Sequence, residues 1–183
     1  DSEATFRIHA DRLTLNTHEV LARLAEIKNK YHILIGLTTT GDNQVEVIKK
    51  SLEVMAGGSP LFDVYQVTYN ILDQSLQAIS KKLIDAGMRI IIKESLANGR
   101  VFPNDNYIHY HDLYNILTNT AKKYGVGVDA IALRFCLDSL HPFMVLSGAS
   151  EISQIEQNLQ SNQFILEPED IAILKSFGQD PKS

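Results

Sequence analysis

Polar residues stand at the ends of five short runs that are rich in Ile and Val. In a parallel α/β fold, ligands bind at the carboxyl ends of the strands, so these are the positions where chemistry is expected. The last run leads into a predicted helix, whose N-terminal amides could also hold an anion. The candidate residues are His9, Thr38, Thr39, Thr40, Gln66, Tyr69, Asn70, Lys93, Glu94, Ser147, Gly148 and Ala149.

Each candidate also has a purely structural interpretation. A strand-end histidine such as His9 is often a packed or solvated side chain, and Asn70 is a common turn residue. Lys93 and Glu94 are adjacent and, as an exposed ion pair, would contribute less than about 1 kcal/mol. The threonines and Ser147 are typical of turns and helix starts. No single residue predicts a site, but the convergence of all of them on one end of a sheet favours one.

The runs themselves predict strands, and the segments between them predict helices. Short apolar runs with β-branched residues are typical of buried strands, whereas apolar residues three and four apart are typical of amphipathic helices. The predicted strands are residues 4–9, 32–37, 63–68, 88–93 and 143–146. The predicted helices are one that Thr17 caps, then residues 44–55, 76–86, 113–124, 130–140, 152–159 and 168–178.

Strands alternating with helices predict βαβ units and a parallel sheet. Periodicity alone does not distinguish a five-stranded open sheet from part of a barrel, although the 183 residues fall short of the about 250 of a complete (β/α)8 barrel. Residues 56–60 form a turn cluster, and residues 94–110 form a long connection that indicates a functional or mobile loop. No composition shift marks a boundary, so we expect a single domain over residues 1–183.

Composition and charge exclude several classes of protein. Hydrophobic residues make up 44% and charged residues 21%, which is ordinary globular usage. The net charge of -5 argues against nucleic-acid binding, which needs clustered Lys and Arg, and no apolar run approaches the about 18 residues of a membrane span. The single cysteine favours a reducing compartment, so we expect a cytoplasmic protein. Because Asp1 is not an initiator Met and residues 1–5 do not resemble a signal peptide, we expect translation to start before residue 1.

Other motif-like features predict no site. Residues 125–130 read GVGVDA, but they follow a helix rather than a strand, so the context of a dinucleotide-binding motif fails. His109 and His111 have no third ligand at suitable spacing, so no metal site is expected. Cys136 shares a helical stripe with leucines and is expected to be a small buried apolar residue.

Four strand-end segments resemble the aldo-keto reductase family in order and in spacing. They read IGLTTTGDNQVEVIKKSLEV, LFDVYQVTYNILDQS, IIIKESLANGR and VLSGASEISQIEQNL, and RIHAD resembles the family's segment that ends in its active-site His. The resemblance covers residues 6–174. It implies a (β/α)8 barrel of the TIM type of which these are the fourth to eighth strands, so only about five βα units are expected in this chain.

The resemblance implies an NAD(P)H-dependent oxidoreductase that reduces a carbonyl of a small molecule by hydride transfer, with NADP as the cofactor and NAD as the alternative. His9 would bond to the carbonyl oxygen and stabilise the charge that develops there. Thr38, Thr39 and Gln66 would hydrogen-bond the nicotinamide carboxamide and fix the ring face. The other implied cofactor residues are Lys93, Leu96 near the pyrophosphate, and Ser147, Gly148, Ala149, Gln154, Gln157 and Asn158 around the adenosine half.

The sequence departs from the family pattern in three respects. Lys93 stands where the family has a ring-stacking aromatic residue, and a cation there would disfavour oxidised nicotinamide. Gly148 and Gln154 stand where the family often has Lys or Arg, which leaves no obvious cation for a 2′-phosphate. The family's catalytic Asp, Tyr and Lys lie on the first three strands and have no match here, so we expect the chain alone to be inactive.

An incomplete barrel would leave strand edges and interior surface exposed, so we expect a missing N-terminal part or a partner chain to cover the opening. Two other interpretations stay open. One is a non-catalytic, reductase-like module that binds a nucleotide or a partner protein. The other is an autonomous five-stranded open sheet with an unrelated small-molecule function. The carbonyl substrate is not identified, because specificity lies in loops.

Overall fold

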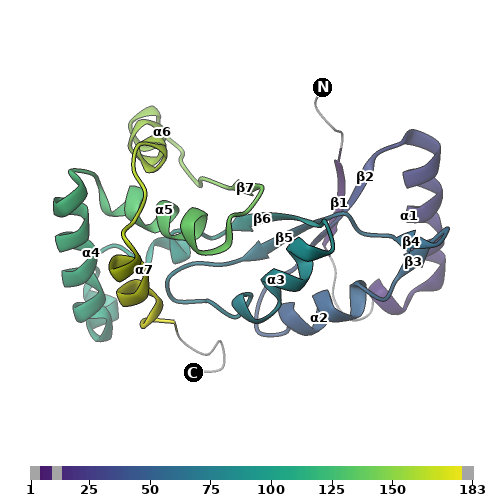
Figure 1. Ribbon diagram of the computed structural model, residues 1–183, viewed down its shortest axis with the longest axis horizontal. Helices are drawn as coiled ribbons and strands as arrows, with labels where there is room; N and C mark the ends of the chain where they lie inside the picture. The colour runs from purple at the N-terminus through teal and green to yellow at the C-terminus, as the bar shows by residue number, and fades with distance from the viewer. Residues whose placement is uncertain (1–4, 10–13, 179–183) are drawn as a thin grey trace. The chain divides into compact units, whose positions relative to one another are not determined.

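The computed structural model describes residues 5–9 and 14–178, in which strands alternate with helices (Figure 1). All five predicted strands are present, although Ala4 and Asp1 lie outside the described residues. The strands are β1 (Thr5–His9), β2 (Leu34–Thr38), β5 (Val64–Thr68), β6 (Arg89–Lys93) and β7 (Met144–Val145). The helices are α1 (His18–Tyr31), α2 (Gln44–Ser51), α3 (Gln77–Asp85), α4 (His111–Tyr124), α5 (Val128–Leu140), α6 (Ile152–Leu159) and α7 (Pro168–Lys175).

The order of the strands distinguishes the two folds that periodicity left open. The sheet runs β1-β2-β5-β6-β7, so its strands follow one another in chain order, and β1 with β2 and β2 with β5 pair in parallel. Open doubly wound sheets reverse their order at a switch point, whereas a βα barrel adds each strand on the same side of the previous one. The observed order is therefore that of an arc of a barrel.

A small hairpin replaces the end of one predicted helix. The helix predicted over residues 44–55 ends at Ser51, and β3 (Met55–Ala56) pairs antiparallel with β4 (Ser59–Pro60). The two residues between these strands, Gly57 and Gly58, have φ angles of 61° and 87°, which only glycine adopts without strain. The predicted turn at residues 56–60 is confirmed, and the error lies in extending the helical pattern into it.

The described chain divides into two compact units. Among the described residues, the first comprises 5–9, 14–67 and 76–91, and the second comprises 68–75 and 92–178. The expectation of a single domain stays a prediction.

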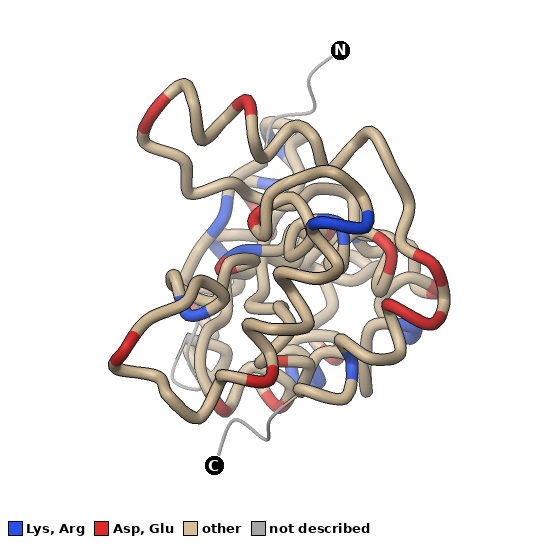
Figure 2. Tube along the Cα trace, turned by 90° about the vertical axis from the view of Figure 1, so that its left-hand side faces the viewer, with Lys and Arg blue, Asp and Glu red and all other residues tan. Residues whose placement is uncertain are grey.

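Lys, Arg, Asp and Glu are interspersed along the trace (Figure 2). No helix in the described ranges is long and apolar enough to cross a membrane.

In the first unit, a partly buried ion pair ties α1 to the beginnings of two strands. The Lys28 Nζ atom donates to Asp63 Oδ1 at 2.8 Å and to the carbonyl oxygen of Pro60 at 2.9 Å. The other carboxylate oxygen of Asp63 accepts the amide of Ile35 at 3.0 Å. These contacts fix the end of the sheet opposite to the candidate residues, so they serve the stability of the strands that carry the site.

In the second unit, α5 is the central helix and contacts α4, α6 and α7. Phe135 is fully buried and stacks on Tyr69, with ring centroids 5.9 Å apart and an interplanar angle of 1°. Cys136 is also fully buried and donates to the carbonyl oxygen of Tyr69 at 3.4 Å. Burial raises the pKa of the Cys136 thiol, so the residue is the small buried apolar residue that the sequence predicts.

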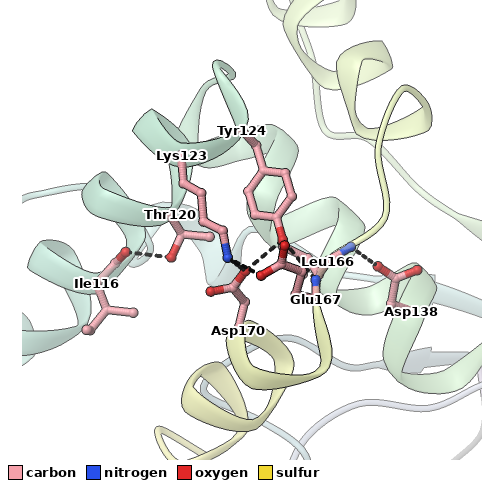
Figure 3. Close-up of polar contacts among 8 residues, drawn as sticks. All are labelled: Ile116, Thr120, Lys123, Tyr124, Asp138, Leu166, Glu167 and Asp170. Carbon is pink, nitrogen blue, oxygen red and sulfur yellow. Dashed lines mark hydrogen bonds and ion pairs between the residues drawn. The ribbon is translucent and has the colours of Figure 1, made fainter.

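Charged contacts hold α7 against α4 (Figure 3). Lys123 pairs with both Glu167 and Asp170, and the Tyr124 hydroxyl donates to Asp170 Oδ2 at 2.7 Å. Burial alone would raise the pKa of the Asp170 carboxyl, but the hydrogen bonds from Lys123 and Tyr124 outweigh burial and lower that pKa. The same two carboxylates raise the pKa of Lys123.

We expect the second unit to lose stability in acid through Asp170. Its folded-state pKa lies below the ordinary value of 3.8, so its contribution is present above that value and is lost as the pH falls through the folded pKa. The variant Asp170→Asn should therefore show a smaller loss of unfolding free energy in acid, measured by urea denaturation at neutral and acid pH. The control Asp85→Asn removes an exposed helix pair with Lys81 and should keep the full acid dependence. An unchanged acid dependence in Asp170→Asn would contradict the assignment.

Candidate functional site

In the first unit, three predicted site residues form one row across neighbouring strands. The pairing register places His9 of β1 beside Thr38 of β2, and Thr38 beside Gln66 of β5. All three lie in the last three residues of their strands, at the carboxyl ends. The Thr39 amide donates to the carbonyl oxygen of Gln66 at 3.0 Å and extends the pairing past the end of β2. The predicted convergence of these residues is confirmed in this unit.

The hydroxyl group of Thr39 is buried and has no hydrogen-bond partner in the described part of the chain. The residue is 1% exposed, and its Oγ1 atom has no hydrogen-bond partner among residues 5–9 and 14–178. A buried polar atom without a partner costs stability, and most such atoms in folded proteins are paired. This hydroxyl is therefore a position at which a bound polar group would supply a missing hydrogen bond.

In the second unit, Lys93 at the carboxyl end of β6 is partly buried and fixed. Its side chain is 15% exposed, and Nζ lies 3.0 Å from Thr68 Oγ1 and 2.8 Å from Glu94 Oε1. The sequence predicts an exposed ion pair as the structural interpretation of Lys93 and Glu94, but the pair is partly buried. Lys93 is held toward the end of β5 rather than extended into solvent.

The loop after β6 has an unusual backbone. Glu94, Ala97 and Asn98 all have positive φ angles, of 57°, 50° and 53°. Such conformations are costly for residues with a Cβ atom and cluster at functional sites. Two contacts hold the loop: the Ser95 hydroxyl donates to the carbonyl oxygen of Leu146 at 3.1 Å, and the Asn70 amide group donates to that of Glu94 at 3.0 Å.

Two hollows of the second unit share Leu96 and Gly148 in their linings. The hollow beside β6, of about 450 Å³, is lined by Lys93, Glu94, Ser95, Leu96, Asn98, Gly99, Leu146, Ser147 and Gly148. The hollow beside α6, of about 320 Å³, is lined by Leu96, Phe102, Asp129, Gly148, Ala149, Gln154, Gln157 and Asn158. The linings of these two hollows include every cofactor residue that the sequence predicts in this unit.

The turn from β7 into α6 is held by side chains that the sequence predicts for the site. The Asn158 Nδ2 atom donates to Ser147 Oγ at 2.7 Å, and the same oxygen accepts the Ala149 amide at 3.2 Å. Gln154 Oε1 accepts the Ser150 amide at 2.9 Å. A Cβ atom built on Gly148 would meet no atom within 4 Å, so the backbone at this residue is open to its surroundings. These polar side chains shape the turn and leave the main chain accessible.

Two candidates from the strand-end rule are structural. Tyr69 is fully buried against Phe135, and burial raises the pKa of its hydroxyl. Asn70 is also fully buried, and its Oδ1 atom accepts the amides of Leu72 and Asp73 at 2.9 and 2.8 Å. The interpretation of Asn70 as a turn residue is confirmed. No group of three or more His, Cys, Asp or Glu residues within the described ranges could hold a metal ion.

Sequence reasoning missed Phe102 and Asp129. Phe102 belongs to the long connection after β6, and Asp129 belongs to the first turn of α5 in the rejected GVGVDA string. Neither follows a strand, so the strand-end rule does not select them. The length of the 94–110 connection was the one available signal, because long ordered loops are often functional.

Comparison with known families identifies this arrangement. The profile of the Aldo/keto reductase family matches residues 5–179, which is nearly the whole chain. The chain belongs to this family. No curated protein matches this aldo/keto reductase chain significantly.

Solved aldo-keto reductases show the same fold. The apo form of one from Bacillus halodurans has 20% sequence identity and a TM-score of 0.75, and the match covers 96% of this chain and 62% of that one. A thermostable aldo-keto reductase in complex with the inhibitor epalrestat has 21% identity and a TM-score of 0.71, with 95% and 59% covered. This aldo/keto reductase chain therefore spans about three fifths of these relatives, as the expected strands four to eight of the barrel would.

Proposed function

We propose that this chain is part of an NAD(P)H-dependent oxidoreductase that reduces a carbonyl group of a small molecule. The observation that carries the proposal is the row of His9, Thr38 and Gln66 at the carboxyl ends of neighbouring strands, beside the unpartnered hydroxyl of Thr39. Membership of the Aldo/keto reductase family supports the same class of reaction.

The residues of the first unit would hold the reacting groups. The bound cofactor supplies a hydride from its reduced nicotinamide. The Thr39 hydroxyl and the Gln66 amide would hydrogen-bond the carboxamide, together with Thr38, and so fix which face of the ring meets the substrate. His9 would donate a hydrogen bond to the carbonyl oxygen, where negative charge develops.

The residues of the second unit would hold the rest of the nucleotide. The open backbone at Gly148 and the hollow beside β6, which Leu96 lines, suit a pyrophosphate, because backbone amides bind phosphate oxygens without requiring a cation. The hollow beside α6 would take the adenosine half, with Ala149, Gln154 and Gln157 in its lining. Lys93 stands at the position of the family's stacking aromatic and would place a cation near the ring.

The proposal assigns the proton donor to residues outside this chain. Burial raises the pKa of Tyr65 to about 12, and this residue accepts a hydrogen bond from Ser51 inside the first unit, so it cannot replace a rim tyrosine. The motifs that carry the family's Asp, Tyr and Lys have no match in the sequence. The chain alone would therefore be inactive, and an N-terminal part or a partner chain would complete the barrel.

A second candidate is a non-catalytic module of the same fold that binds a nucleotide or a partner protein. Lys93 favours it, because an ion-paired lysine replaces the aromatic residue on which the nicotinamide ring would stack. A longer chain that includes the preceding strands distinguishes the two candidates. Turnover with a carbonyl substrate supports the oxidoreductase, whereas nucleotide binding without turnover supports the module.

The substitution Thr39→Val tests the proposal directly. It removes the unpartnered hydroxyl, so the unfolding free energy should stay the same or rise, whereas affinity for reduced nicotinamide nucleotide should fall by about tenfold, the value of one hydrogen bond. Fluorescence titration and urea denaturation measure the two effects.

The matched control is Thr120→Val, in which the lost hydroxyl donates to the Ile116 carbonyl at 2.8 Å (Figure 3). This variant should lose some stability and keep its nucleotide affinity. Equal affinities of Thr39→Val and the unchanged protein would exclude Thr39 from the site, and no binding of either NADH or NADPH would refute the proposed function.

A further inference from the structure

The hollow beside α6 contains a negative charge and no positive one. The eight residues that line it include no Lys and no Arg, and Asp129 is the one charged residue among them. Lys93 lines the other hollow, where it is paired with Glu94. A ligand in the hollow beside α6 therefore meets a carboxylate without a compensating cation in the lining.

Asp129 is a buried residue whose carboxylate has no partner among the described residues. The residue is 8% exposed, and its side chain makes no hydrogen bond or ion pair within the described part of the chain. The carboxylate lies over Gly127, where a Cβ atom would come within 2.2 Å of Oδ1. Asp129 therefore brings two acceptor oxygens to the lining of the hollow that no donor among the described residues engages.

The neighbouring amide side chain cannot take over the role of a cation. Gln154 also lines the hollow, and its Oε1 atom accepts the Ser150 amide at 2.9 Å, but its amide group is neutral and carries no compensating charge. A phosphate monoester in the hollow would bring about two negative charges close to a carboxylate, with no Lys or Arg in the lining. A sugar with free hydroxyl groups would instead donate hydrogen bonds to that carboxylate, and such charge-assisted bonds are the stronger kind.

We propose that the Asp129 carboxylate makes this chain select NAD(H) over NADP(H). The inference rests on the proposed function, since it assumes that the adenosine half of the nucleotide occupies the hollow beside α6. Asp129 would accept hydrogen bonds from the ribose hydroxyls of NAD(H) and would repel the 2′-phosphate of NADP(H). The aromatic ring of Phe102, in the same lining and 38% exposed, offers the adenine an apolar surface.

The test is a set of calorimetric titrations of the full 183-residue chain with NADH, NADPH, ADP and adenosine 2′,5′-bisphosphate. NADH should bind about 10- to 100-fold more tightly than NADPH, the range expected for hydrogen bonds to a charged group. ADP should be preferred over the bisphosphate in the same sense. NADPH binding as tightly as NADH, or more tightly, would overturn the inference and leave the proposed function standing. Failure of both dinucleotides to bind would overturn the proposed function as well.

Two variants assign the selectivity to the residues named. Asp129→Asn keeps the shape of the side chain and should reduce the NADH preference by about tenfold, whereas Gln154→Arg adds a cation to the lining and should move the preference toward NADPH. The control Glu156→Gln removes an exposed charge of α6 that does not line the hollow and should leave the ratio unchanged. If Asp129→Asn is unstable in thermal denaturation, Gln154→Arg alone decides. An unchanged ratio in Gln154→Arg would contradict the placement of the ribose.

Discussion

Replacing Phe135 by alanine should lower the free energy of unfolding of the second unit by about 3–5 kcal/mol. The ring is fully buried in α5, and its stack on Tyr69 ties that helix to the segment that follows β5. Deleting it removes the apolar burial of an aromatic side chain and leaves a cavity against Tyr69. Typical domains have only about 5–15 kcal/mol of total stability, so the loss is a large part of the whole.

Urea denaturation followed by far-UV circular dichroism measures this effect, since the chain has no Trp to serve as a fluorescent probe. The control is Phe143→Ala, because Phe143 is 59% exposed, and its replacement should cost less than about 0.5 kcal/mol. Equal midpoints for the two variants would show that the stack does not organise the second unit.

Most of the fold could be predicted because buried parallel strands have a recognisable pattern in the sequence. Strands β5 and β6 are almost entirely buried, so they appear as continuous runs such as VYQVT and RIIIK. Helix α6 begins and ends at the predicted residues because its apolar spacing is regular. The helix over residues 44–55 was overextended, since the periodic pattern continued where the glycines at 57 and 58 allow a hairpin instead.

The candidate site was predicted only in part. Strand ends are visible in a sequence, so the row from His9 to Gln66 could be predicted before its register was known. Tyr69 also follows a strand, but no local signal showed that its ring packs on Phe135, which lies 66 positions further along the chain. Phe102 and Asp129 approach Gly148 only through the packing of the second unit, and packing between distant segments leaves no periodic trace.

The largest expected effect concerns catalysis. We expect the 183-residue chain alone to reduce a carbonyl substrate about 10²- to 10⁴-fold more slowly than a complete aldo-keto reductase, which is the range attributed to a positioned proton donor. The reason is that Tyr65 and Tyr69 are buried, with pKa values raised by burial, and the family's own donor motif has no match. The residues proposed to bind the nucleotide are nevertheless present, so we expect binding and turnover to separate.

The most direct measurement follows both properties in one preparation of the chain. Titration with NADH and NADPH gives the affinity, and the loss of nucleotide absorbance with an aldehyde gives the rate, with the Bacillus halodurans aldo-keto reductase as the reference for a complete barrel. The account predicts saturable binding of at least one nucleotide together with a rate reduced by the factor given above. Turnover at the rate of the reference enzyme would contradict it, because the proton donor would then lie within this chain. Failure of both NADH and NADPH to bind would also contradict it.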